Sequence, residues 1–106
     1  MTSKTKKAKT ASPRLPRTVR GFFIVKNGKG LHTRPSTELV KCAANFRSQI
    51  FLHCRDCSVN AKSLLGILML AAEKGAKIRI EASGEDAREA VDALVDLANQ
   101  QFKIQY

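Results

Sequence analysis

No run of apolar residues in this 106-residue chain approaches the roughly 18 to 20 that a membrane-spanning helix needs. The first 20 residues also lack the apolar middle region of a secretory signal. We therefore expect a cytoplasmic protein without membrane insertion. Cysteine is scarce and odd in number, at positions 42, 54 and 57, which argues against a disulfide framework and for reduced thiols.

Acidic residues are absent from the first 20 positions, which carry seven Lys and Arg. The whole chain holds 19 Lys and Arg against 9 Asp and Glu, but residues 21–106 hold only 12 against 9. We expect residues 1–20 to be a basic, disordered tail and residues 21–106 to be one nearly balanced domain. Pro13 and Pro16 argue against an amphipathic transit peptide. This partition also weakens a nucleic-acid interpretation, which remains open only through the tail.

Hydrophobic periodicity predicts seven elements in the order β-α-β-β-α-β-α. They are expected at 22–25, 35–46, 50–54, 57–61, 64–72, 78–82 and 87–98. Ser63 is a suitable N-cap for the second helix, and Gly75 a suitable stop. Ser83 and Asp86 have the spacing of a capping box before the third helix. Four strands and three helices in so short a domain favour a two-layer α+β sandwich with one open sheet face.

The segment Gly30-Leu31-His32-Thr33-Arg34-Pro35-Ser36 places a histidine between a glycine-containing turn and a helix start. Backbone N–H groups at a helix N-terminus favour an anion, and the Arg34 fork suits phosphate oxygens. A neutral imidazole is nucleophilic, so His32 could accept a phosphoryl group. Alternatively, His32 merely caps the helix and Arg34 is solvated, and spacing alone favours this second interpretation.

The same segment resembles the Gly-Leu-His-Ala-Arg-Pro-Ala signature of the HPr family, the histidine-containing phosphocarriers of the bacterial phosphoenolpyruvate-dependent phosphotransferase system (PTS) of sugar transport. A second block, Val59-Asn60-Ala61-Lys62-Ser63-Leu64-Leu65-Gly66, resembles the regulatory-serine motif of that family. The similarity spans residues 21–106 and implies an antiparallel four-stranded sheet with three helices on one face. The chain differs from the signature at Thr33 and Ser36, and has Lys29 where many members have Asn.

The resemblance implies a monomeric phosphoryl carrier without a cofactor, rather than an enzyme. His32 would accept phosphate on Nδ1 from phospho-enzyme I and pass it to an enzyme IIA-type domain, with Arg34 stabilising the phosphate. Ser63 would be the target of an HPr kinase/phosphorylase. The second helix is apolar on nearly every side, so we expect Ile67 and Leu70 in the core and the excess to form a docking patch. The expected docking residues are Thr37, Lys41, Leu64, Leu65 and Leu68.

The Cys54-x-x-Cys57 pair could hold zinc or perform redox chemistry, but no second ligand pair is evident and a redox motif normally opens a helix. Alternation places His53, a solvated strand residue in this interpretation, on the face opposite Cys54. We therefore expect structural thiols and no metal site. Two other functions stay open: an HPr-like protein that regulates a partner without sugar transport, and a nucleic-acid-associated protein acting through its tail.

Overall fold

The computed structural model describes residues 17–100, so most of the tail expected at 1–20 lies outside the described residues. The element order β-α-β-β-α-β-α is confirmed. The elements are β1 (Thr18–Ile24), α1 (Thr33–Ala43), β2 (Gln49–Cys54), β3 (Cys57–Asn60), α2 (Leu64–Leu70), β4 (Lys77–Ser83) and α3 (Ala87–Asn99).

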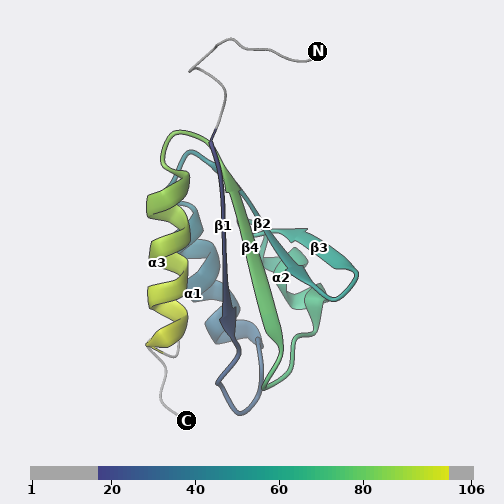
Figure 1. Cartoon of the computed structure of the whole chain (residues 1–106). Coiled ribbons are helices and arrows are strands. Elements are labelled where there is room, and N and C mark those ends of the chain that lie inside the picture. The colour runs from purple at the N-terminus through teal and green to yellow at the C-terminus, as the bar shows by residue number, and fades with distance from the viewer. Residues whose placement is uncertain (1–16, 101–106) are drawn as a thin grey trace.

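The four strands form one antiparallel sheet in the order β1-β4-β2-β3. The helices pack on one side of it, with α1 in contact with both α2 and α3 (Figure 1). This is the two-layer sandwich that the sequence predicts. The core lies between the layers, where Ile78, Ile80 and Ala82 of β4 alternate with solvent-facing residues, as expected for a sheet with one wet face.

Strand β1 begins at Thr18, three residues before the domain boundary expected at residue 21. Thr18, Val19 and Arg20 pair with Ser83, Ala82 and Glu81 of β4, and the Arg20 guanidinium lies 3.0 Å from the Glu81 carboxylate. Buried Val19 is therefore part of the core. The charge of Arg20 associates it with the basic residues before it, so the sequence alone does not indicate that the strand begins at Thr18.

Helix α2 ends at Leu70, earlier than residue 72, and Gly75 is not its stop. Ala71 ends the helix in the left-handed conformation, with φ of +50°, and its N–H donates to the Leu68 carbonyl. A helix that ends at a left-handed alanine has no strong sequence signal, because glycine usually occupies that position. The early end leaves the Ala72 carbonyl available for a contact with the loop before α1, described below.

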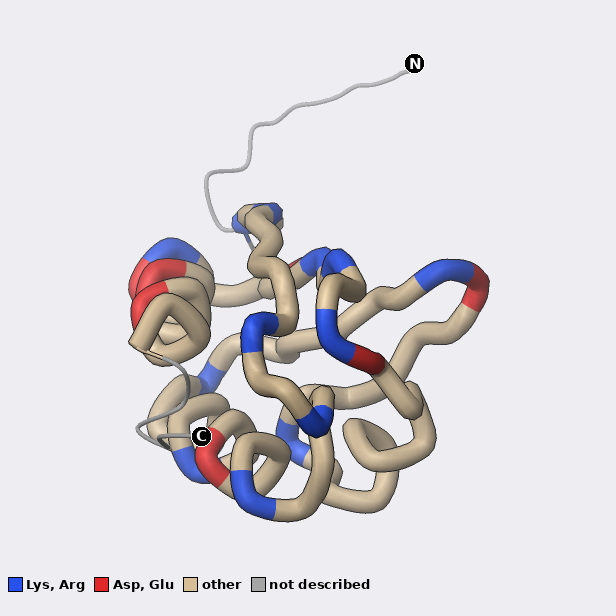
Figure 2. The backbone as a smooth tube through the Cα atoms, turned by 90° about the horizontal axis from the view of Figure 1, so that it is seen from below, with Lys and Arg blue, Asp and Glu red and all other residues tan. Residues whose placement is uncertain are grey.

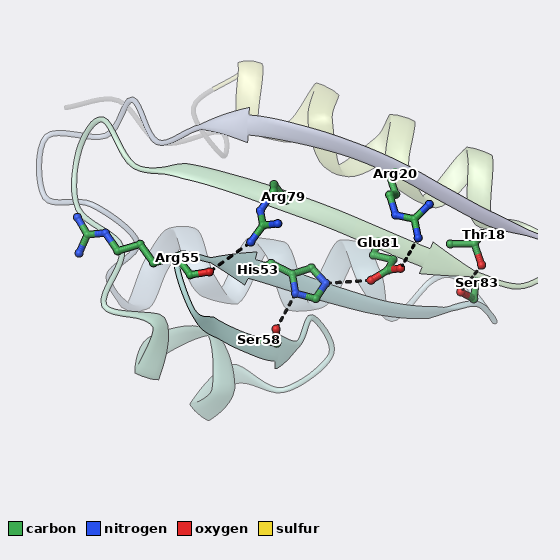
Figure 3. A network of polar contacts seen from close by, with 8 residues as sticks. All are labelled: Thr18, Arg20, His53, Arg55, Ser58, Arg79, Glu81 and Ser83. Carbon is green, nitrogen blue, oxygen red and sulfur yellow. Dashed lines mark hydrogen bonds and ion pairs between the residues drawn. The ribbon is translucent and has the colours of Figure 1, made fainter.

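The open face of the sheet carries a polar network (Figure 3). His53 is more than a solvated strand residue. Its Nδ1 lies 2.6 Å from the Ser58 hydroxyl, and its Nε2 lies 3.1 Å from the Glu81 carboxylate, which also accepts from Arg20. These contacts join all four strands across the face opposite the helices. His53 therefore has a structural role that strand alternation alone could not show.

The predicted capping box of Ser83 and Asp86 is wrong. Ser83 ends β4, where its hydroxyl lies 3.0 Å from that of Thr18. Asp86 is itself the N-cap residue of α3, but its side chain makes no cap bond. Its carboxylate instead accepts from the Ser48 hydroxyl at 2.5 Å, the Ser48 N–H at 2.9 Å and the Arg47 N–H at 2.8 Å. These bonds fasten the loop between α1 and β2 to the start of α3. The Ser48 hydroxyl, followed by the backbone donors, lowers the Asp86 pKa from 3.8 to about 2.

Replacement of Asp86 by Asn tests this contact. The folded pKa is below the unfolded value, so the carboxylate stabilises the fold above pH 4 or so, and this contribution is lost as the pH falls toward 2. In urea titrations, Asp86→Asn should be less stable than the parent chain at pH 7, with the difference closing at low pH. Asp92→Asn, which removes the same charge from an exposed pair with Arg88, should change stability less. Equal effects of the two variants would contradict the assignment.

Candidate functional site

The loop before α1 is joined to the segment after α2 by backbone hydrogen bonds. Val25 N–H donates to the Ala76 carbonyl at 2.9 Å, and Gly75 N–H donates to the Val25 carbonyl at 2.8 Å. Further along, Leu31 N–H donates to the Ala72 carbonyl at 2.9 Å. These bonds connect two segments that are far apart in sequence. His32 directly follows Leu31, the donor of the last bond.

Gly30 permits that approach. Its φ is +71°, and a Cβ on this residue would lie 2.4 Å from the Ala72 carbonyl oxygen and 3.0 Å from the Glu73 Cα. The added Cβ would therefore clash with backbone atoms, which cannot move aside as a flexible side chain can. A residue with a side chain would have to push the two segments apart, so glycine is required both by conformation and by space.

Leu31 is held on both sides immediately before His32. Besides the bond from its N–H to Ala72, its carbonyl accepts from the buried Ser36 hydroxyl at 3.1 Å. The Leu31 side chain is itself buried. These contacts fix the backbone that enters α1, and hence the position from which the His32 imidazole projects.

His32 is the N-cap residue of α1 and is partly exposed, but its side chain makes no capping bond to the helix. His32 thus holds the cap position without capping through its side chain. Ser36 N–H donates to the His32 carbonyl at 3.0 Å, and Pro35 has no N–H. The first turn thus offers the N–H groups of Thr33 and Arg34, beside the histidine and at the positive end of the helix dipole.

Three basic residues on or before α1 differ in their distance from its N-terminal end, where His32 lies. Arg34 is exposed in the first turn of α1, and Lys29 is exposed in the loop before it. Lys41 is in the last turn, about 12 Å along the helix from Thr33, and lies 3.5 Å from Glu38. Lys29 and Arg34 therefore belong to the N-terminal end of α1, whereas Lys41 belongs to its opposite end.

Charge is uneven over the domain. Five of the nine acidic residues fall between 85 and 96, at and before α3, while residues 21–84 carry ten Lys and Arg against four Asp and Glu. Figure 2 shows these basic residues on several sides of the described chain rather than in one stripe. Residues 21–84, which contain α1 and α2, therefore carry a larger net positive charge than residues 21–106 as a whole.

His32 is partly exposed at the start of α1. A hollow of about 590 Å³ lies between α1 and α3, lined by residues that include Glu38, Lys41, Asp96 and Leu97, and His32 is not among them. Over residues 17–100, no three His, Cys, Asp or Glu side chains gather as metal ligands, and no helix is long and apolar enough to cross a membrane. The histidine is thus presented on a surface, which suits exchange with another macromolecule better than enclosure of a small substrate.

The block before α2 is held by structural contacts. The Asn60 side chain accepts from the Lys62 N–H at 2.8 Å, and Lys62 Nζ donates at 2.6 Å to the carbonyl of Phe46, in the loop between α1 and β2. Ser63 caps α2 as predicted, with its hydroxyl oxygen accepting from Gly66 N–H at 3.0 Å. Each polar member of this block therefore has a role in folding, whatever its role in regulation.

Helix α2 divides into a buried and an exposed side as expected. Ile67 and Leu70 are in the core, while Leu64 and Leu65 are 37% and 69% exposed and Leu68 is partly exposed. Met69, not among the expected docking residues, is also 69% exposed. The spacing of Leu65 and Met69, one helical turn apart, could have identified it. Helix α2, which carries this apolar surface, is in contact with α1.

The comparisons with known proteins agree with one another. The family described as "PTS HPr component phosphorylation site" matches residues 19–100. The chain belongs to the HPr family. Phosphocarrier protein HPr of Neisseria meningitidis is 43% identical over 76 residues, which cover 72% of this chain and 85% of that protein. HPr is a phosphocarrier of the PTS and not a catalytic enzyme.

Solved HPr structures share the fold. An HPr from Thermoanaerobacter tengcongensis (HPr-C-His) has a TM-score of 0.79 and 38% identity, covering 83% of this chain and 99% of that one. A second structure, described as an HPr dimer from the same organism, has a TM-score of 0.65 and 41% identity, with 76% and 92% coverage. The four-stranded sheet and three helices are thus those of HPr.

One departure from the HPr signature has a structural explanation. Ser36, in place of alanine, supplies the hydroxyl that holds the Leu31 carbonyl. Thr33, also in place of alanine, is exposed, and its backbone carbonyl accepts from the Thr37 hydroxyl at 2.7 Å, a bond that alanine would also allow. Neither residue disrupts the helix start. Ser36 instead adds a bond to the loop that carries His32.

Replacement of Gly30 by Ala tests the contact that places His32. The left-handed conformation alone costs an L-residue about 1–2 kcal/mol, and the clash with the Ala72 carbonyl adds to it. We expect a corresponding loss in the free energy of unfolding, measured in urea. Gly28→Ala is the matched control, since a Cβ there meets nothing within 4 Å. If Gly30→Ala were no more destabilising than Gly28→Ala, the close approach would not constrain the loop.

Proposed function

We propose that His32 is the phosphorylated residue of this phosphocarrier. It accepts the phosphoryl group on Nδ1 from phospho-enzyme I and passes it to an enzyme IIA-type domain. In each transfer the bond between phosphorus and the donor nitrogen breaks as a new bond to the acceptor forms. Each acceptor nitrogen must therefore be unprotonated at the moment of attack.

The position of His32 at the N-terminus of α1 carries the proposal. A phosphoryl group on the imidazole brings negative charge to the end of a helix whose Thr33 and Arg34 N–H groups have no partner within that helix. These donors and the helix dipole stabilise the added charge without a change of fold. Because the backbone from Gly30 to Ser36 is already fixed, little ordering is needed when the phosphoryl group arrives.

Arg34 is the second phosphate-stabilising group in this proposal. It is exposed in the first turn of α1, and its planar fork can donate two hydrogen bonds to phosphate oxygens. An exposed side chain can approach the phosphoryl group after transfer and leave it for the next acceptor. Such reversibility suits a carrier, which must not hold the group too tightly.

The docking surface that we propose combines α1 with the exposed side of α2. Its residues are Thr37, Lys41, Leu64, Leu65, Leu68 and, from its exposure, Met69. An exposed apolar helix side in a part of the chain rich in Lys and Arg fits a partner with an apolar centre and acidic margins. We propose that the protein works as a monomer in the cytoplasm, with enzyme I and an enzyme IIA-type domain as its partners.

Replacement of His32 by Ala tests the proposal. With phosphoenolpyruvate and enzyme I, the parent chain should acquire one acid-labile phosphate, and His32→Ala should acquire none, because the accepting nitrogen is gone. His53→Gln is the matched control and should be labelled like the parent chain, since His53 lies on the open sheet face. Full labelling of His32→Ala would contradict the proposal.

We further propose that Ser63 is a regulatory phosphorylation site for an HPr kinase/phosphorylase. Its hydroxyl is partly exposed at the N-terminus of α2, directly before Leu64 and Leu65 of the docking surface. A phosphate there is tolerated by the helix end but places almost two negative charges beside the surface where an acidic partner would dock. Phosphorylation of Ser63 would therefore weaken docking rather than unfold α2.

A pair of matched substitutions separates charge from capping at Ser63. Asp and Asn cap helices about equally well, so Ser63→Asp and Ser63→Asn should both fold with near-parent stability. Only Ser63→Asp adds charge, and it should raise the KM of enzyme I for this carrier several-fold, while Ser63→Asn should leave it near the parent value. Steady-state phosphotransfer would measure this. Equal KM values for the two variants would exclude an electrostatic switch at this position.

A further inference from the structure

Cys54 and Cys57 are direct partners across the β2–β3 hairpin. The turn between them is Arg55-Asp56, and the register places the Cα of Cys54 opposite that of Cys57. Residues directly opposite one another in antiparallel strands have Cα atoms about 4.5–5.5 Å apart, within the span of about 4.4–6.8 Å that a disulfide bridges. The spacing that opens a helix in redox enzymes therefore flanks a hairpin turn here, with the two cysteines opposite one another on neighbouring strands.

The two side chains also share one side of the hairpin. Both cysteines line a hollow of about 370 Å³ between the hairpin turn and the end of α2, together with Leu70, Ala71 and Ala72. Cys54 is only 7% exposed, whereas Cys57, on the edge strand β3, is exposed. One thiol is thus accessible to a reagent from solvent, and its partner is protected beside it.

We propose that Cys54 and Cys57 form a reversible disulfide by exchange with a small disulfide such as oxidised glutathione, independently of the carrier function. The Cys57 thiolate attacks one glutathione sulfur, and the other glutathione leaves as its thiolate. The Cys54 thiolate then attacks the Cys57 sulfur and expels the second glutathione. In total two protein thiols are oxidised to one disulfide, and one oxidised glutathione is reduced to two glutathione molecules.

The sequence allows a direct assignment, because trypsin cleaves after Lys and Arg and each cysteine lies on its own peptide. The peptides are 42–47, 48–55 and 56–62, and cleavage after Arg55 separates Cys54 from Cys57. The folded full-length chain is equilibrated with reduced and oxidised glutathione in set ratios and blocked with N-ethylmaleimide. It is then digested without reductant and analysed by mass spectrometry.

We expect peptides 48–55 and 56–62 to be joined by a disulfide, with a mass two hydrogen atoms below the sum of the two reduced peptides. Peptide 42–47 should carry the maleimide. When the oxidised chain is reduced with dithiothreitol before blocking, all three cysteines should carry maleimide. A glutathione adduct on 56–62 as the only product in the parent chain would overturn the proposal, as would linkage through 42–47. Cys42→Ala is the matched control and should still give the 48–55 to 56–62 linkage.

Two variants test the order of attack. Cys54→Ala, which keeps the buried site apolar, should stop at a glutathione adduct on Cys57, and circular dichroism should confirm that it is folded. Cys57→Ser should leave Cys54 without glutathione over the time in which the parent chain is fully oxidised. Rapid glutathione addition to Cys54 in Cys57→Ser would contradict the assigned roles of the exposed and buried thiols.

Discussion

The contact between Gly30 and the Ala72 carbonyl is the constraint on which the rest of the site depends. It lets the Leu31 N–H reach the same carbonyl, and this bond ties the loop before α1 to the segment after α2. Helix α2 must end at Ala71 for the carbonyl to be available. The start of α1, the end of α2 and the position of His32 are therefore parts of one arrangement rather than three local features.

This arrangement explains how so small a domain can carry a phosphoryl group. In the proposed function, Arg34 and the backbone donors at the end of a helix that is already fixed in place stabilise the group, so no enclosed pocket is needed. The partial exposure of His32 would give large partners access to it. An apolar side of α2 and a basic composition around α1 would complete the proposed docking surface, while the acidic α3 lies apart from it in sequence.

Much of this could be predicted from the sequence, because the signals were local and periodic. The alternation of Ile78, Ile80 and Ala82 and the capping position of Ser63 both depend on near neighbours, and both predictions are confirmed. The HPr signature likewise lies within a few consecutive residues. Burial of Ile67 and Leu70 followed from the limited room between two layers.

Most of the incorrect predictions involved partners distant in sequence. Asp86 has the spacing of a capping residue, but its carboxylate binds the loop at Arg47 and Ser48. Charge assigns residues 18–20 to a basic tail, but they pair with β4. His53 has two partners on other strands. The end of α2 is different, because Ala71 adopts there a conformation that local preference gives to glycine.

The most direct test of the central claim observes the helix end while the group is attached. The chain, labelled with ¹⁵N, is phosphorylated by enzyme I and phosphoenolpyruvate, and its amide and imidazole resonances are recorded by NMR. Phosphorus coupling should appear on Nδ1 of His32, with the largest amide shifts at Thr33 and Arg34. Coupling on another residue, or Thr33 and Arg34 amides that do not move, would contradict the account.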